Sequence, residues 1–282
     1  MVLSGLIEEQ ARAKVNVALH VTGRRADGYH LLDSIVAFAD LCDRLSVAPA
    51  RSNSLRITGP QSADLDPRDN LVLRAREAMA QVFGALIPNI AVELDKHIPL
   101  ASGLGGGSAD AAATLRALCR LTGLDHGSRA IHDIALSLGA DVPACLGSRA
   151  CRMQGIGDGL EPLAALDPLH VVLANAGPAL ATAEVFAALG LAPGETGYPP
   201  LDTPCDLEHA RNDLTPAATR LLPVIGEVLA ALRAAPKAKF ARMSGSGGTC
   251  FAVFSSPADA EQAAAELASR HPDWWIRRAM LS

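Results

Sequence analysis

The segment PLASGLGGGSADAAATL, residues Pro99 to Leu115, has glycine at four of the five positions 103–107 and then becomes rich in alanine. Glycine has no Cβ, so a run of glycines lets several backbone N–H groups converge on one anion. The apolar residues that follow recur at helical spacing, which predicts a helix at 108–121 that Ser108 could cap. The unpaired N–H groups and the positive dipole end of such a helix favour phosphate. The segment therefore predicts a phosphate-binding loop at a helix N-terminus.

Three common phosphate-binding motifs do not fit this segment. A Walker A loop has a lysine directly after its last glycine, and no lysine follows these glycines. A dinucleotide-binding fingerprint would place glycine at Ser108 and a tight turn after the strand, whereas residues 99–102 intervene. The H-R-D and D-F-G sequences of protein kinases are absent from the chain. We therefore expect a different kind of phosphate site.

Hydrophobic patterns on both sides of the segment predict a mixed fold. Strands are predicted at 13–21, 35–39, 44–47, 54–58, 90–94, 169–173, 238–243, 250–254 and 274–279. Helices are predicted at 70–83, 108–121, 131–138, 182–189, 221–234 and 257–270. A Gly- and Pro-rich stretch at 155–168 marks a soft boundary. These elements predict an α+β fold with two domains, 1–160 and 161–282.

Composition narrows the class of protein. The chain has 282 residues and a net charge of -5, with no dense run of Lys or Arg, which argues against a nucleic-acid partner. No apolar run approaches the roughly 18–20 residues that cross a bilayer, and the N-terminus does not look like a secretion signal. Six scattered cysteines without a C-x-x-C pair are typical of free thiols. We therefore expect a cytoplasmic protein that binds neither nucleic acid nor membrane. We also expect the protein to be a monomer or a weak homodimer.

The glycine segment resembles the phosphate loop of the GHMP kinases, a superfamily of small-molecule kinases that includes galactokinase, homoserine kinase and mevalonate kinase. Three further segments carry the resemblance: ARAKVNVALHVTGRRADGYHLLDSI at 11–35, LGADVPACL at 138–146 and ARMSGSGGTCFAVF at 241–254. The first of them is similar to the opening motif of those GHMP kinases whose substrate is a cytidine-diphosphate polyol. The resemblance spans essentially the whole chain.

This resemblance implies a two-domain GHMP kinase fold, of α+β or α/β class. The N-terminal domain would be similar to domain 2 of ribosomal protein S5, and the C-terminal domain would be ferredoxin-like. The implied activity is ATP-dependent phosphorylation of a hydroxyl of the cytidine-diphosphate polyol in isoprenoid precursor biosynthesis, with ATP and Mg²⁺ as cofactors. Two alternatives stay open: another GHMP kinase, of the homoserine or mevalonate type, and a non-catalytic nucleotide-binding protein on the same fold.

Two residues are predicted to be catalytic. The resemblance implies that Asp141 orients and deprotonates the attacking hydroxyl, and that Lys14 faces it and keeps its carboxylate ionised. Lys14 is one of four lysines in the chain and lies in an apolar strand, where a cation is costly unless it meets an anion. The alternatives are a solvent-facing strand lysine and an aspartate that only forms a turn.

The resemblance also assigns the ATP-binding segment. Its residues are Pro99, Leu100, Ala101, Ser102, Gly103, Leu104, Gly105, Gly106, Gly107, Ser108 and Ala109. Ser108 could ligate Mg²⁺ through its hydroxyl or could simply cap the helix, so the metal site is left unassigned. Asn70 and Lys96 could approach the adenine, and neither is given a role. The second glycine-rich turn, at 244–248, is expected to support the active-site loops.

Five residues are implied to bind the substrate. Asn16 lies on the same strand face as Lys14 and would hydrogen-bond the polyol. Tyr29 would stack on the cytosine ring and His30 would bind its edge. Thr182 would lie near the diphosphate or polyol, and Phe186 would close the cytosine from the other side. Phe186 could instead be a core residue of a helix.

Overall fold

The computed structural model describes residues 5–63, 65–67, 70–163, 166–202 and 206–282. The chain divides into two compact units built from interleaved segments. Unit 1 consists of Met1–Lys14, Leu41–Leu100 and Gly105–Ser148, and unit 2 of Val15–Asp40, Ala101–Leu104 and Arg149–Ser282. The strands β1 (Ile7–Arg24) and β2 (His30–Pro49) contribute residues to both units. The predicted domain boundary at residue 160 stays a prediction.

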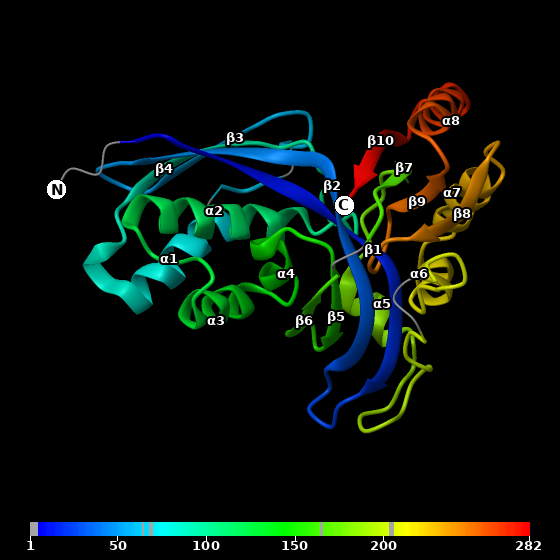
Figure 1. Ribbon diagram of the computed structural model, residues 1–282, viewed down its shortest axis with the longest axis horizontal. Helices are drawn as coiled ribbons and strands as arrows, with labels where there is room; N and C mark the ends of the chain where they lie inside the picture. The colour runs from blue at the N-terminus through cyan, green and yellow to red at the C-terminus, as the bar shows by residue number, and fades with distance from the viewer. Residues whose placement is uncertain (1–4, 64, 68–69, 164–165, 203–205) are drawn as a thin grey trace. The chain divides into compact units, whose positions relative to one another are not determined.

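Unit 1 is a sheet with helices gathered on one side (Figure 1). β3 (Ser54–Thr58) pairs in parallel with β4 (Ile90–Asp95), and β4 pairs antiparallel with the last residues of β2. The helices are α1 (Leu71–Phe83), the short 3₁₀ helix η1 (Gly84–Leu86), α2 (Gly106–Thr122), α3 (Arg129–Leu138) and α4 (Val142–Gly147). Alternate residues Ile90, Val92 and Leu94 are buried, so β4 hides one of its faces in the unit's core.

Unit 2 has an antiparallel sheet in the order β10-β7-β9-β8. Its strands are β7 (Leu169–Asn175), β8 (Ala238–Met243), β9 (Cys250–Phe254) and β10 (Trp275–Leu281). A hairpin of β5 (Cys151–Gly155) and β6 (Gly159–Pro162) pairs with the first residues of β2. The helices are α5 (Thr182–Ala187), α6 (Thr215–Leu221), α7 (Val224–Arg233) and α8 (Pro257–Arg270). Cys250, Ala252 and Phe254 share one core with α7 and α8, so both helices cover the same sheet face.

The α+β class is confirmed, and most predicted elements lie within a few residues of their expected bounds. The helix predicted at 221–234 corresponds to α7 but begins only at Val224, because the chain leaves helical geometry at Leu222, where φ is -137° and ψ is 86°. Pro223 follows, and proline disfavours the helical conformation in the residue before it. The strands predicted at 35–39 and 44–47 are one continuous strand, β2. The elements α4, α6, β5 and β6 and the short helix η1 were not predicted from the sequence.

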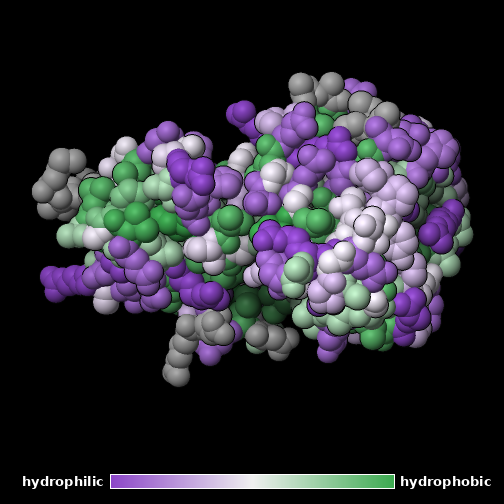
Figure 2. Space-filling view, turned by 90° about the horizontal axis from the view of Figure 1, so that it is seen from below, coloured by the Kyte–Doolittle hydropathy of each residue, from purple (hydrophilic) through white to green (hydrophobic). Residues whose placement is uncertain are grey.

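The surface of unit 1 mixes apolar and charged side chains. Figure 2 looks onto its helical side, at the left of the view, where apolar side chains gather over α1 and α3.

In the described ranges no helix is both long and apolar enough to cross a bilayer. Cys42, Cys119, Cys145, Cys151 and Cys250 are free thiols, and Cys205 lies outside the described residues.

Candidate active site

An ion pair joins the two residues predicted to be catalytic. Lys14 lies on β1 with its side chain 4% exposed, and its Nζ is 2.8 Å from Oδ1 of Asp141, whose side chain is 34% exposed. Asp141 is the residue before α4, the position at which an aspartate often caps a helix, yet its side chain caps no N–H group there. Unit 1 therefore holds a carboxylate that is paired with a buried cation and still open to a ligand.

The glycine segment forms an uncapped helix start beside this pair. α2 begins at Gly106, and Gly105 occupies the cap position in the left-handed conformation, with φ of 63°. Ser108 is therefore the third residue of the helix and not its cap, which corrects the predicted helix start. Because no side chain caps α2, the N–H groups of its first turn are available to an anion.

Gly105 also packs closely on Lys14. A Cβ at Gly105 would lie 3.3 Å from both Cβ and Cε of Lys14. The missing side chain thus lets the backbone of the phosphate-binding segment approach the Lys14 side chain. The residues present fit a phosphate group, because donors, helix dipole and ammonium ion gather within one unit.

The middle of the segment, residues 101–104, belongs to unit 2 and is held by the second glycine-rich turn. Oγ of Ser244 donates to the carbonyl of Gly103 at 2.9 Å, and the N–H of Thr249 donates to the carbonyl of Ser102 at 2.9 Å. A Cβ at Gly103 would lie 2.4 Å from the Ser244 carbonyl oxygen, so only glycine fits there. The turn at 244–248 therefore fixes the backbone of this loop.

Asn16 is anchored within the same unit. Its backbone N–H donates to Oγ of Ser244 at 3.1 Å, and its side-chain Nδ2 donates to Oγ of Ser34 at 2.8 Å. Ser34 in turn donates to the carbonyl of Ala18 at 2.6 Å. The buried amide is thereby oriented by neighbours on β1 and β2.

Two of the residues predicted to bind substrate, His30 and Phe186, have rings that lie next to each other. The rings of His30 and Phe186 have centroids 4.8 Å apart and planes inclined at 36°. Nε2 of His30 is buried and has no hydrogen-bond partner among the described residues. Burial, followed by the positive charge of Arg24, lowers the pKa of His30 below its usual value. A neutral, half-buried imidazole with an unused nitrogen is suited to bind the edge of a flat polar ring.

The other two residues predicted to bind substrate, Thr182 and Tyr29, are not part of this ring pair. Oγ1 of Thr182, at the start of α5, lies 2.9 Å from Oγ of Ser246, so it is linked to the second glycine-rich turn. Tyr29 is 62% exposed, and no ring among the described residues stacks on it. Phe186 also packs against the core of unit 2, so it combines a core contact with the ring contact to His30.

A buried triad beside the start of α2 was not predicted from the sequence. Nζ of Lys96 bridges carboxylate oxygens of Asp43 and Asp110, at 2.6 Å from Oδ2 of Asp110. Asp110 lies in the second turn of α2, and a Cβ at Gly106 would lie 3.0 Å from the Lys96 Nζ. Asp43 also accepts the N–H groups of His97 and Ile98. An aspartate among alanines on a buried helix is the sequence signal that could have revealed the triad.

The triad ties α2 to the strands of unit 1. Its two carboxylates and one ammonium ion are almost fully buried, and Oδ1 of Asp110 has no hydrogen-bond partner among the described residues. Burial raises the pKa of Asp110 to about 7. Asn70, the other residue without a role, caps α1 by accepting the N–H of Val72. Across the described ranges, no three His, Cys, Asp or Glu side chains are grouped to hold a metal ion.

Known families and proteins match the chain along most of its length. The family described as GHMP kinases N terminal domain matches residues 70–149, and GHMP kinases C terminal matches residues 204–273. The chain is 46% identical over 297 residues to the 4-diphosphocytidyl-2-C-methyl-D-erythritol kinase of Bradyrhizobium sp. (strain ORS 278), covering 99% of this chain and 98% of that protein. The enzyme of the same name from Paramagnetospirillum magneticum is 45% identical over 279 residues, covering 96% and 97%.

Solved structures of kinases also superpose on nearly the whole chain. A crystal structure of 4-(cytidine 5'-diphospho)-2C-methyl-D-erythritol kinase superposes with a TM-score of 0.81 at 35% identity, covering 98% of this chain and 99% of that one. Homoserine kinase from Cytophaga hutchinsonii superposes with a TM-score of 0.70 at 19% identity, covering 100% and 96%, which shows a shared fold.

Proposed function

Because the chain belongs to the 4-diphosphocytidyl-2-C-methyl-D-erythritol kinase family of the GHMP kinases, we propose that it phosphorylates the 2-hydroxyl of that substrate with ATP. The products are the 2-phosphate and ADP, and the reaction belongs to isoprenoid precursor biosynthesis. Support comes from relatives of that name which match nearly the whole chain. The single observation that carries the catalytic assignment is the ion pair between Lys14 and Asp141.

In this proposal Asp141 is the general base. Its side chain does not cap α4 and is partly exposed. It can therefore accept the proton of the attacking hydroxyl as that oxygen bonds to phosphorus. Lys14 holds the carboxylate in one orientation through the ion pair. The buried ammonium ion also adds positive charge near the transferring phosphoryl group, where negative charge is spread over the equatorial oxygens.

ATP is bound through its phosphates. The uncapped N–H groups of Gly106, Gly107 and Ser108 would donate to phosphate oxygens, with the dipole of α2 behind them. Residues 99–109 as a whole form the proposed ATP-binding segment. The Ser108 hydroxyl, at the third helical position, is proposed to help hold Mg²⁺, which would supply positive charge to neutralise the phosphates.

The cytidine part of the substrate is proposed to bind His30 and Phe186. The unused Nε2 of His30 would bind the cytosine edge, and Phe186 would cover one face of the ring. Tyr29, whose ring is exposed, is free to cover the other face. Asn16 and Thr182 are proposed to hydrogen-bond the polyol or diphosphate.

The rival kinases have alcohol substrates of a different chemistry. Homoserine and mevalonate contain no nucleobase, so their binding would not require a neutral histidine beside a phenylalanine. A non-catalytic nucleotide-binding protein would not need the ion pair of Lys14 and Asp141. The first observation favours the cytidylylated polyol as the substrate, and the second favours catalysis.

An ADP-release assay tests the proposal. The purified chain is given ATP and Mg²⁺ with the cytidylylated polyol, with homoserine or with mevalonate, and Asp141→Asn serves as a control for contaminating kinases. We expect turnover with the first alcohol alone, and none with the variant. Turnover with homoserine or mevalonate alone would leave only the superfamily. No turnover with any alcohol would overturn the enzymatic proposal.

We also propose that the enzyme works in the cytoplasm as a monomer or weak homodimer. ATP as phosphoryl donor and the buried free thiols Cys145 and Cys250 support an intracellular, reducing compartment. Sedimentation equilibrium over a range of concentrations measures the oligomeric state, and a concentration-independent larger mass would contradict it.

A further inference from the structure

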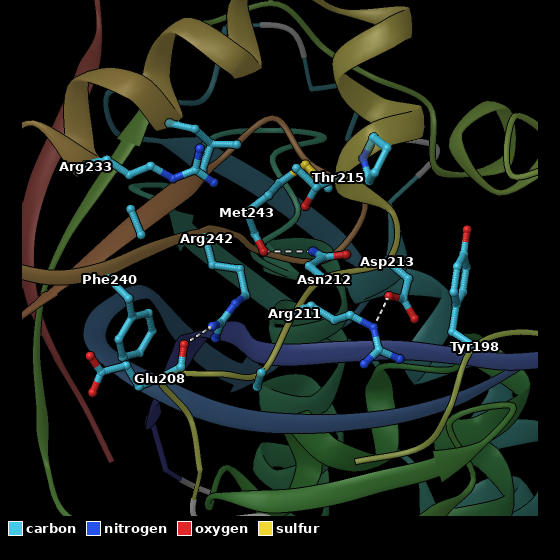
Figure 3. Close-up of a pocket in the computed structure, with 14 residues that line it drawn as sticks. Tyr198, Glu208, Arg211, Asn212, Asp213, Thr215, Arg233, Phe240, Arg242 and Met243 are labelled. Carbon is cyan, nitrogen blue, oxygen red and sulfur yellow. Dashed lines mark hydrogen bonds and ion pairs between the residues drawn. The ribbon is translucent and has the colours of Figure 1, made fainter. Parts of the chain in front are cut away.

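Unit 2 contains a cavity of about 560 Å³ that none of the proposed kinase residues line. β8 and the C-terminal end of α7 form one wall, and the segment at 210–216 and Tyr198 form the other (Figure 3). A volume of several hundred Å³ is typical of pockets for small organic ligands. The charges on its walls indicate what kind of ligand it would take.

Arg242 is a buried cation that has no carboxylate partner among the residues that the structure describes. It is 7% exposed, and its guanidinium donates to the carbonyl oxygens of Val17 at 2.5 Å, Leu207 at 3.0 Å and Glu208 at 3.3 Å. A guanidinium has five N–H donors, so three acceptors leave two donors over. Burial, followed by the charge of Arg233, lowers the pKa of Arg242 to about 10, and the group remains charged at neutral pH. Its positive charge is therefore solvated by carbonyl dipoles and not balanced by a negative charge.

Arg233 adds a second cation to the same wall. It is the last residue of α7, and Figure 3 shows its side chain reaching from that helix toward β8, which carries Arg242. Among the described residues it has no ion pair or hydrogen bond from its side chain. Two like charges on one wall repel each other, and an anion bound between them would relieve that repulsion.

The opposite wall is close to neutral. Nε of Arg211 lies 2.6 Å from Oδ1 of Asp213, and Oδ2 of Asp213 accepts the N–H of Val21 at 2.8 Å. The guanidinium of Arg211 lies over the ring of Tyr198, 6.0 Å from its centroid. The charges of Arg211 and Asp213 therefore cancel. The remaining charged residues of the described lining are Glu208, which is negative, and Arg233 and Arg242, which are positive, so the lining has a net charge of one positive unit.

Apolar groups complete the cavity. The ring of Phe240 lies 4.8 Å from the Arg242 guanidinium carbon, and Leu229 and Met243 also line the space. Such walls favour a ligand with an apolar body next to its charged group. We propose that this cavity binds a small organic oxyanion, a phosphate monoester or a carboxylate with an apolar body, through Arg233 and Arg242. Guanidinium groups recognise both oxyanions, because their paired N–H donors match two oxygens.

Calorimetric titration of the full chain tests this proposal. The probes are phenyl phosphate and benzoate, with benzyl alcohol as the uncharged control, and ADP is present in excess so that the phosphate loop is occupied. We expect one or both anions to bind and benzyl alcohol not to bind measurably. Comparison of the two anions shows which oxyanion the cavity prefers.

Three variants locate the binding. Arg233→Met should weaken anion binding about tenfold or more, because it removes a charged donor from an exposed position where folding does not depend on it. Arg51→Met, which removes an exposed arginine of unit 1 away from the cavity, should leave the affinity unchanged. Glu208→Gln should strengthen binding by removing the opposing carboxylate. Equal affinities of the wild type and Arg233→Met, or equal binding of benzyl alcohol, would overturn the proposal.

Discussion

Nζ of Lys14 lies 2.8 Å from Oδ1 of Asp141, and this contact joins the first strand of the chain to the residue before α4. The two residues are far apart in sequence, and neither has a local reason to be paired. Lys14 is nearly buried, whereas Asp141 remains one-third exposed. The pair thus combines a fixed cation with a carboxylate that a substrate can reach.

Lys14→Ala should lower kcat by about 10²–10⁴-fold, the usual range for loss of a group that supports proton transfer and charge stabilisation. The KM for ATP should change little, because the N–H groups at the start of α2 still bind the phosphates. Steady-state kinetics measures both constants. Lys237→Ala, at an exposed lysine paired with Asp259, is the matched control and should keep full activity. A wild-type kcat in Lys14→Ala would refute the assignment.

Asp141→Asn should also lower kcat by about 10²–10⁴-fold, because an amide cannot accept the proton. Residues that act as a unit show strongly non-additive losses. The double variant Lys14→Ala/Asp141→Asn should therefore be hardly slower than the worse of the two single variants. Losses that multiply would mean that the two side chains act independently.

Phe186→Ala should raise the KM for the cytidylylated polyol about tenfold to hundredfold, the equivalent of about 1–3 kcal/mol for one stacked base. The KM for ATP should stay unchanged. Phe186→Leu keeps the core contact of this side chain and removes the aromatic face, so it separates packing from stacking. Equal KM values for wild type and Phe186→Leu would assign Phe186 to the core alone.

Asp110 should make stability depend on pH. Its pKa in the folded state, about 7, lies above the ordinary value near 4, so the folded chain binds one more proton than the unfolded chain between those limits. The free energy of unfolding should therefore fall as pH rises from about 4 to 7, and this contribution should be absent in Asp110→Asn. The melting temperature of Asp110→Asn relative to wild type should increase over that range.

The control for this titration is Asp133→Asn, which changes an exposed aspartate paired with Arg129 on α3. Its melting temperature should stay at a constant offset from wild type over the same pH range. Differential scanning calorimetry at several pH values measures all three proteins. A constant offset for Asp110→Asn as well would show that Asp110 does not hold the extra proton.

Much of the fold followed from local patterns. Local patterns predicted the bounds of β3, β8, β9 and α8. The helix α8 has a helical period, β9 is a short continuous apolar run, and polar or Gly/Pro residues bound these elements. The helix start at Gly106 was missed because the cap is made by the left-handed backbone of Gly105 rather than by a side chain. The break at Leu222 was missed because the apolar pattern continues across Pro223.

The motifs of the sequence determined the family, the phosphate-binding segment and the candidates Lys14 and Asp141, since each depends on residue types at fixed spacing along the chain. The tertiary structure alone decided which of these side chains meet, and which remain apart. It paired Lys96 with Asp43, 53 positions away, and with Asp110. It also surrounded Arg242 with carbonyl groups, and no carboxylate of the described part of the chain pairs with it. Burial and charge balance are properties of the packed chain, and distant segments supply the neighbours that set them.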